Sequence, residues 1–103
     1  MRHFYRTQLT PAEAVDAADA FFGAMGLKTV ASAARTRTYQ GVVGEPELVA
    51  HVRVKVRAEG GHYTFVEVDT DQMGESRVDR NVKRFFVELH RRLEPAHGPE
   101  AAY

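Results

Sequence analysis

Basic and aromatic side chains recur at alternate positions along two neighbouring segments of the chain, residues 48–58 and 62–70. In the first segment the basic residues alternate with valines, and this period of two predicts a strand with one dry and one wet face. Cations interleaved with aromatic rings are what a sheet uses to neutralise phosphates and to stack bases. The same surface suits a protein–protein contact, and a third alternative is an ordinary solvated face on which Glu67 and Asp69 balance the arginines. We expect these residues to share the wet face: Arg35, Arg37, Tyr39, Arg53, Lys55, Arg57, Tyr63 and Phe65.

A second set of basic residues lies at helical spacing nearer the C-terminal end. It comprises Arg77, Arg80, Arg84 and Arg91. Such a stripe on an exposed helix is typical of phosphate binding. The alternative is an ordinary solvated face, or one that lies against the acidic side of an earlier helix, with its Glu13, Asp16 and Asp19.

The remaining polar residues form no catalytic or metal-binding pattern. The segment 69–75 begins like a calcium-binding loop, but the fifth and twelfth positions of such a loop would be Met73 and Arg80, which offer no side-chain oxygen. The five histidines lack an H-x-x-x-H spacing, and neither serine lies in a nucleophile elbow. The absence of cysteine excludes disulfides, thiolate zinc sites and cysteine nucleophiles. We therefore predict no catalytic residue, cofactor or metal, and a binding protein is favoured over an enzyme.

Capping residues at helix ends and the alternation of apolar with polar residues predict two helices and several strands. Thr10-Pro11-Ala12-Glu13 is a capping box that begins a helix ending near Met25, where Gly26 follows. Residues 28–40, 48–58 and 62–70 are predicted strands, residues 2–8 are a candidate edge strand, and residues 41–47 are a turn. A second amphipathic helix is predicted from about residue 76 to residue 93, where Glu94-Pro95 ends it.

The hairpin between residues 48–58 and 62–70 has a predictable register. The buried valines of both strands are even-numbered, and residues that face each other share one side of the sheet. Paired residue numbers must then have an even sum, which a three-residue loop provides and a two-residue loop does not. This register sets two acidic residues, Glu67 and Asp69, among His51, Arg53 and Lys55.

These elements predict one α+β domain over residues 1–94, with a two-layer (β)αβββα architecture. An antiparallel sheet of three or four strands carries both helices on one face and leaves the other face open. The 103 residues, 44% hydrophobic and 27% charged, are ordinary for one globular domain. Residues 95–103 are expected to form a flexible tail. Because no signal-peptide core or membrane-spanning run is evident, we expect a cytoplasmic protein without membrane contact, and the Ala/Arg/Val-rich composition is typical of bacteria.

The helix, three strands and helix of residues 11–93 follow the element order of the double-stranded-RNA-binding domain, which the chain resembles. That family opens its second helix with a lysine cluster, whereas this chain has Ser76-Arg77-Val78-Asp79-Arg80 there. With the first strand included, the pattern is similar to small TBP-like or helix-grip-like single-domain bacterial proteins, through helix, Gly26-Leu27, three strands, Gly74 and C-terminal helix. This resemblance implies a scaffold for binding or assembly and carries no chemical motif.

Three functions are compatible with these patterns. The leading hypothesis is an interaction module that forms a dimer, or contacts another protein, through its open sheet face or an edge strand, with Tyr39, Tyr63 and Phe65 as anchors. The alternative is nucleic-acid binding by the same face or by the basic helix stripe. A further alternative is a small-ligand pocket between sheet and helices, near Met25, Met73 and Phe86.

Overall fold

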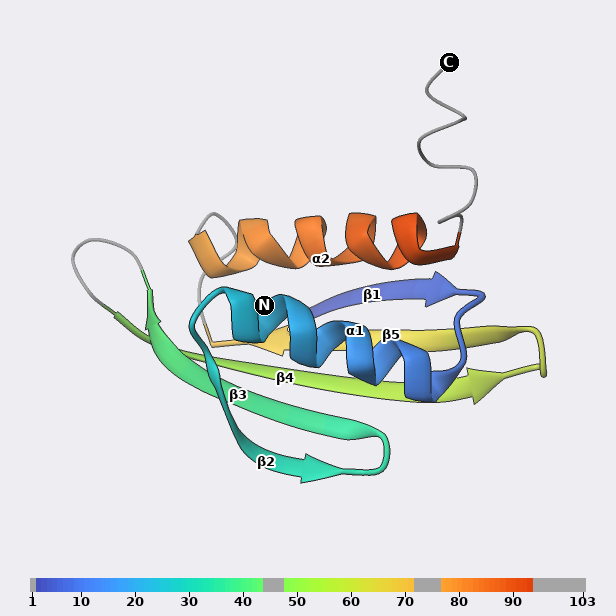
Figure 1. Cartoon of the computed structure of the whole chain (residues 1–103), viewed down its shortest axis with the longest axis horizontal. Coiled ribbons are helices and arrows are strands. Elements are labelled where there is room, and N and C mark those ends of the chain that lie inside the picture. The colour runs from blue at the N-terminus through green and yellow to red at the C-terminus, as the bar shows by residue number, and fades with distance from the viewer. Residues whose placement is uncertain (1, 44–47, 72–76, 94–103) are drawn as a thin grey trace, which may run out of the picture.

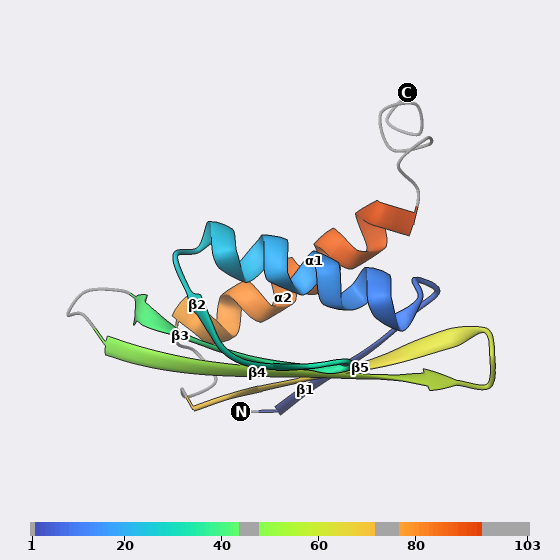
Figure 2. The same cartoon turned by 60° about the horizontal axis from the view of Figure 1, so that its bottom comes forward.

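The computed structural model describes residues 2–43, 48–71 and 77–93, which form one antiparallel sheet covered on one side by two helices. The elements in chain order are β1 (Arg2–Thr7), α1 (Pro11–Ala24), β2 (Lys28–Ala33), β3 (Thr36–Val43), β4 (Leu48–Glu59), β5 (Tyr63–Thr70) and α2 (Arg77–Leu93). The strands lie in the order β1-β5-β4-β3-β2, so β1 and β2 form the two edges (Figure 1). Figure 2 shows both helices on the same side of the sheet, which confirms the α+β class.

The sheet has five strands, so the prediction of three or four was wrong. Residues 28–40 are two strands rather than one, because β2 turns back into β3 at Ala34 and Arg35. No glycine, proline or asparagine marks this turn, and neither of its residues has a positive φ. The composition of the segment therefore gave no signal for a hairpin. The predicted edge strand at residues 2–8 is present as β1.

Helix α1 begins and ends where its sequence predicts. The Thr10 hydroxyl accepts a hydrogen bond from the Glu13 N–H at 3.2 Å, and the Glu13 carboxylate accepts one from the Thr10 N–H at 2.9 Å. This backbone hydrogen bond holds the pKa of Glu13 below its usual value. Gly26 follows the helix with φ +89°, a left-handed conformation that glycine adopts without a Cβ clash.

The core lies between the sheet and the helices and is rich in aromatic rings. Phe22 of α1 and Phe85 of α2 are both fully buried, with ring centroids 5.1 Å apart. Phe22 also lies 5.1 Å from the ring of Tyr39 on β3. Alanines at positions 14, 17 and 18 are fully buried too, and their small side chains let α1 lie close to the strands.

The β4–β5 hairpin has the predicted register. Glu59 pairs with Tyr63 across a three-residue loop, residues 60–62, in which Gly60 and Gly61 have positive φ. Arg53 lies opposite Asp69, and Lys55 lies opposite Glu67. The even-numbered valines of β4 are buried under the helices, while the basic residues between them are exposed on the other side. The prediction of one dry and one wet face is confirmed.

In the β3–β4 pair, unlike the β4–β5 pair, each odd-numbered residue lies opposite an even-numbered one. Val43 pairs with Leu48 across residues 44–47, so the paired residue numbers have an odd sum. Tyr39 therefore lies opposite Val52 and Arg37 opposite Val54, on the side that the helices cover. The prediction that Arg37 and Tyr39 lie on the wet face was wrong, because the four-residue connection shifts β3 by one position relative to β4.

Gly41 lies within β3, although residues 41–47 were predicted to be a turn. A Cβ built on Gly41 would be 2.5 Å from Leu27 Cδ2, 3.1 Å from Leu27 Cα and 3.3 Å from the Gly26 carbonyl oxygen. The chain segment that links α1 to β2 therefore crosses β3 at a place where only a hydrogen atom fits.

Candidate functional site: the open face of the sheet

The side of the sheet away from the helices carries a mixed basic and aromatic surface, which we call the open face. The registers of the strands place these residues on it: Arg2, Phe4 and Arg6 of β1; Tyr63, Phe65, Glu67 and Asp69 of β5; His51, Arg53, Lys55, Arg57 and Glu59 of β4; and Thr36, Thr38 and Gln40 of β3. No described helix covers this side (Figure 2).

Three aromatic rings cross the open face from β1 to the end of β5, and we call Phe4, Phe65 and Tyr63 the aromatic row. The rings of Phe4 and Phe65 lie 5.4 Å apart. Phe4 is 52% exposed and Tyr63 is 47% exposed, while Phe65 between them is half-buried. The two outer rings are therefore available to a flat ligand, and Phe65 packs against Phe4.

Arginines flank the aromatic row. The Arg57 guanidinium carbon lies 4.7 Å from the Phe65 ring centroid, and that of Arg6 lies 5.8 Å from it. Both distances are within the range of cation–π interactions. A shallow hollow next to this cluster is lined by Phe4, Tyr5, Arg6 and Phe65, and a second is lined by Arg35, Thr36, Lys55, Val56, Arg57, Phe65 and Glu67.

The carboxylates of the open face neutralise its border more than its centre. Asp69 pairs with Arg2 at 3.0 Å, and Glu59 pairs with Arg6 at 2.8 Å and with Arg57 at 3.7 Å. Within the described residues, Arg53 and Lys55 form no ion pair. The middle of β4 therefore presents two cations to solvent.

The structure brings six of the eight predicted face residues together. Five lie on the open face, and Arg35 of the β2–β3 turn lines the second hollow: Arg35, Arg53, Lys55, Arg57, Tyr63 and Phe65. Sequence reasoning missed the contribution of β1, which adds Arg2, Phe4 and Arg6. Their alternation with His3, Tyr5 and Thr7 could have suggested a shared face, but only pairing with β5 shows which face it is.

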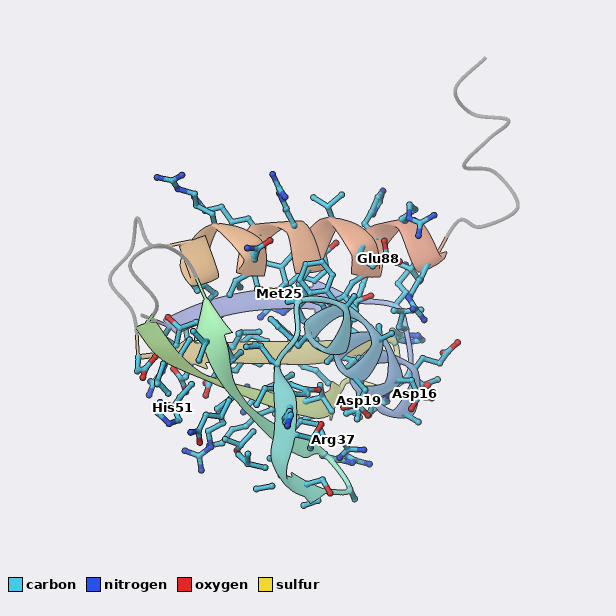
Figure 3. The ribbon with its side chains drawn as sticks, turned by 60° about the vertical axis from the view of Figure 1, so that its left-hand side comes forward. Asp16, Asp19, Met25, Arg37, His51 and Glu88 are labelled. Atoms are coloured by element: carbon cyan, nitrogen blue, oxygen red, sulfur yellow. The ribbon has the colours of Figure 1, made fainter. Side chains whose placement is uncertain are left out.

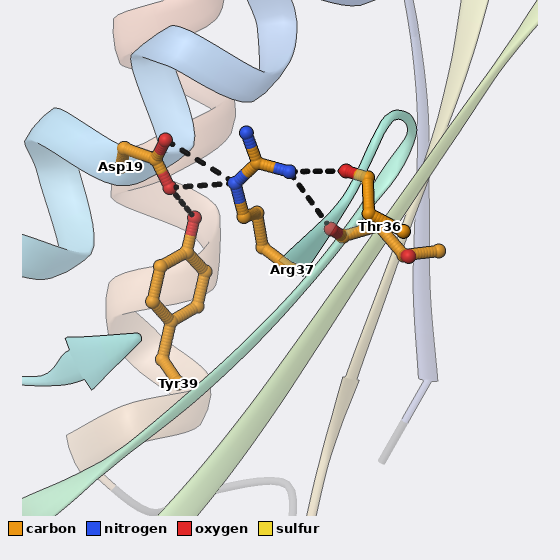
Figure 4. Close-up of polar contacts among 5 residues, drawn as sticks. Asp19, Thr36, Arg37 and Tyr39 are labelled. Atoms are coloured by element: carbon orange, nitrogen blue, oxygen red, sulfur yellow. Dashed lines mark hydrogen bonds and ion pairs between the residues drawn. The ribbon is translucent and has the colours of Figure 1, made fainter. Parts of the chain in front are cut away.

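Arg37 and Tyr39 instead form a polar cluster with Asp19 of α1 beneath the helices (Figure 4). The Tyr39 hydroxyl donates to Asp19 Oδ1 at 2.7 Å, and Arg37 Nε lies 3.2 Å from the same oxygen. Arg37 also donates to the backbone carbonyls of Ala33 and Thr36. The cluster ties α1 to β3 and to the β2–β3 turn, so its role is structural.

The Tyr39 hydroxyl makes the stability of the fold sensitive to alkaline pH. Burial, and then the hydrogen bond to Asp19, raise the pKa of Tyr39 above its ordinary value near 10. The unfolded chain therefore releases this proton first, so the stabilisation is complete below about pH 10 and is lost as the pH rises above it. Above pH 10 we expect the free energy of unfolding of the parent protein to fall by up to about 1.4 kcal/mol per pH unit. The Tyr39→Phe variant should lack this fall.

Urea unfolding at several pH values from neutral to strongly alkaline measures this slope. Tyr63→Phe is the matched control, because it removes the hydroxyl of a tyrosine that is exposed on the open face. Equal alkaline slopes for Tyr39→Phe and the parent protein would show that Tyr39 does not carry the effect.

The predicted basic stripe lies on the outer side of α2. Arg80, Arg84 and Arg91 are exposed, as are Lys83 and Arg92, while Arg77 lies at the start of the helix and its side chain is outside the described set. Figure 3 shows nitrogen-tipped side chains that project from α2 away from the sheet. No ion pair joins this stripe to Glu13, Asp16 or Asp19 within the described residues. Arg80, Arg84 and Arg91 therefore do not join α2 to these three carboxylates of α1.

Other predictions concern the histidines, the possible metal ligands and the residues expected near a pocket. His51 Nδ1 lies 2.7 Å from the Asp71 carboxylate, at the opposite end of the β4–β5 hairpin from His62. Among the described side chains no group of three or more His, Asp or Glu could hold a metal ion. Met25 and Phe86 pack against the core, while Met73 and the expected tail at 95–103 lie outside the described residues.

Comparisons with known proteins give no relative from which a function could be transferred. No family model matches the chain, and no curated protein matches it. Over residues 2–43, 48–71 and 77–93, no helix is long and apolar enough to cross a membrane. Function is therefore inferred from the geometry of the open face.

Proposed function

We propose that the open face binds a single-stranded nucleic acid. The observation that carries the proposal is the aromatic row on β1 and β5 beside the exposed cations of β4. Bases would stack on the exposed rings of Phe4 and Tyr63, and phosphates would lie along Arg53, Lys55 and Arg57. Single strands suit this surface because their bases are free to stack, whereas the bases of a duplex are already stacked on one another.

The charge of the open face supports an anionic ligand. Its strands carry five cations (Arg2, Arg6, Arg53, Lys55 and Arg57) against three carboxylates (Glu59, Glu67 and Asp69), although the whole chain has a formal net charge of zero. Two copies that met face to face would bury Arg53 and Lys55, which form no ion pair within the described residues. Such a contact is unfavourable, so the open face suits nucleic acid better than self-association.

Binding of a fluorescent single-stranded oligonucleotide of about 12 nucleotides, followed by anisotropy at increasing salt, tests the proposal. For single strands the salt slope is about −0.7 per phosphate contact, so the triple variant Arg53→Gln/Lys55→Gln/Arg57→Gln should flatten it by about 2. Lys28→Gln, on β2 at the far edge of the sheet, is the control for loss of a distant charge and should keep the parent slope.

Two results would contradict the proposal. One is the absence of binding at low salt. The other is a duplex of the same length that binds as tightly as the single strand, because stacking would then contribute nothing.

Self-association through β2 is a second candidate function. All six residues of this edge strand are exposed, and its outer edge pairs with no strand in the described part of the chain. Lys28 is its one charged residue, and a register shift lies between Thr29 and Ala31. Two copies joined antiparallel through β2 would form a continuous sheet. Light scattering tests this candidate, and a monomer at high micromolar concentration would contradict it.

A further inference from the structure

We propose that the outer side of α2 is a second phosphate-binding surface, so that one molecule holds two nucleic-acid strands on opposite sides and bridges them. The proposal rests on the function proposed for the open face. It adds a separate site, carried by different residues, and an activity that a single binding face does not have.

Three cations in the first half of α2 are exposed and have no ion-pair partner among the side chains that the structure describes. Arg80, Lys83 and Arg84 are exposed, and none of them forms an ion pair within the described residues. They are three and four positions apart, which places them on one side of the helix within about 6 Å along its axis. Three exposed cations this close together can contact neighbouring phosphates of one nucleic-acid backbone.

The far end of α2 is different, because its arginines are already engaged. Arg91 makes two hydrogen bonds to the Glu88 carboxylate at 2.8 and 2.9 Å, and Arg92 lies 3.4 Å from the same group. These contacts hold the pKa of Glu88 below its usual value and so keep it charged. The start of α2 is therefore the stronger candidate for a phosphate site, and Arg91 and Arg92 offer a matched control.

The two surfaces lie on opposite sides of the molecule. In Figure 2 the helices lie on one side of the sheet and the open face is on the other, and in Figure 3 the nitrogen-tipped side chains of α2 point away from the sheet. A short strand on the open face therefore leaves the α2 surface free for a second strand.

The ligand of the α2 surface is the phosphate backbone rather than the bases. Its exposed apolar residue is Val87, at 67% exposure, and the two phenylalanines of α2 lie elsewhere, since Phe85 is fully buried and Phe86 stacks on Tyr5 at 5.0 Å. Without an exposed phenylalanine or tyrosine to stack on, binding there depends mainly on charge. The α2 surface should accept single strands and duplexes alike, and with little regard to sequence.

A two-strand capture assay tests the inference. One oligonucleotide is immobilised, the full-length protein is added, and capture of a second, labelled, non-complementary oligonucleotide is measured. We expect capture by the parent protein and its loss in Arg80→Gln/Lys83→Gln/Arg84→Gln, while that variant still binds the immobilised strand. The control Arg91→Gln/Arg92→Gln should still capture the second strand.

The outcomes separate the two proposals. If the parent binds the first strand but captures no second strand, the α2 surface is not a site and the open-face proposal stands. If the α2 variant binds no strand at all and remains folded by circular dichroism, the open face is not the primary site, and both proposals fail. If the variant captures the second strand as well as the parent, bridging comes from association of two molecules, and the α2 proposal is overturned.

Discussion

Replacing Phe4 and Tyr63 together with leucine is expected to weaken the binding of a single-stranded oligonucleotide by about 10- to 100-fold. These are the two exposed rings of the aromatic row, at 52% and 47% exposure. Stacking of a base on an aromatic ring contributes about 1–3 kcal/mol, and leucine keeps apolar surface but offers no flat ring. The salt dependence should change little, because the substitutions remove no cation. Fluorescence anisotropy measures both quantities.

The matched control for this loss lies on the same side of the sheet. Val42 and Val49 face each other on β3 and β4 and are 54% and 53% exposed. Val49 is eight positions from Arg57 on β4, or about 27 Å away in an extended strand. Val42→Ala/Val49→Ala removes exposed apolar surface far from the aromatic row and should leave affinity unchanged. Equal losses in the two double variants would mean that general apolar surface, rather than base stacking, drives binding.

The largest expected effect on stability comes from adding one methyl group at Gly41. We expect Gly41→Ala to lower the free energy of unfolding by about 1–3 kcal/mol. The new Cβ would be 2.5 Å from Leu27 Cδ2, a side chain that is only 5% exposed, and 3.1 Å from the Leu27 Cα. Rotation of the leucine relieves the first clash but not the second, so backbone at the α1–β2 link must move. Urea unfolding measures the change.

Gly23 offers a control of opposite sign. It lies in α1, it is exposed, and a Cβ at this position would meet nothing within 4 Å. Gly23→Ala should raise the free energy of unfolding by about 0.5–1 kcal/mol, because alanine is the better helix former. If Gly41→Ala also stabilised the protein, the close approach of Leu27 to β3 would not limit this position.

The sequence predicted those parts of the fold that depend on local signals. The capping box at Thr10, the alternation of β4 and the spacing of apolar residues in α2 each determine a structure within one element, and each was confirmed. The β4–β5 register followed as well, because valines on both strands had to share the dry face. That register was enough to place Arg53, Lys55 and Phe65 on the open face.

The parts that were missed depend on how elements pair. The alternation around Arg37 and Tyr39 shows that the two residues share one side of the sheet. Which side it is depends on the length of the connection between β3 and β4. The β2–β3 turn has no glycine, so one long strand and a hairpin have the same local pattern. Phe4 joins the aromatic row only because β1 pairs with β5, a contact between distant parts of the chain that no periodicity predicts.

The pairing of β1 with β5 has a consequence for the order in which the molecule is assembled. Strands β2, β3 and β4 each pair with the next strand along the chain, whereas the Arg2–Asp69 pair joins residues 67 positions apart. Contacts of such long range form late, after the entropy of closing the loop has been overcome. During synthesis β1 leaves the ribosome first, yet it cannot dock until β5 has followed. We therefore expect Phe4 and Phe65 to meet late in folding, so that the aromatic row is not complete until β1 has docked on β5.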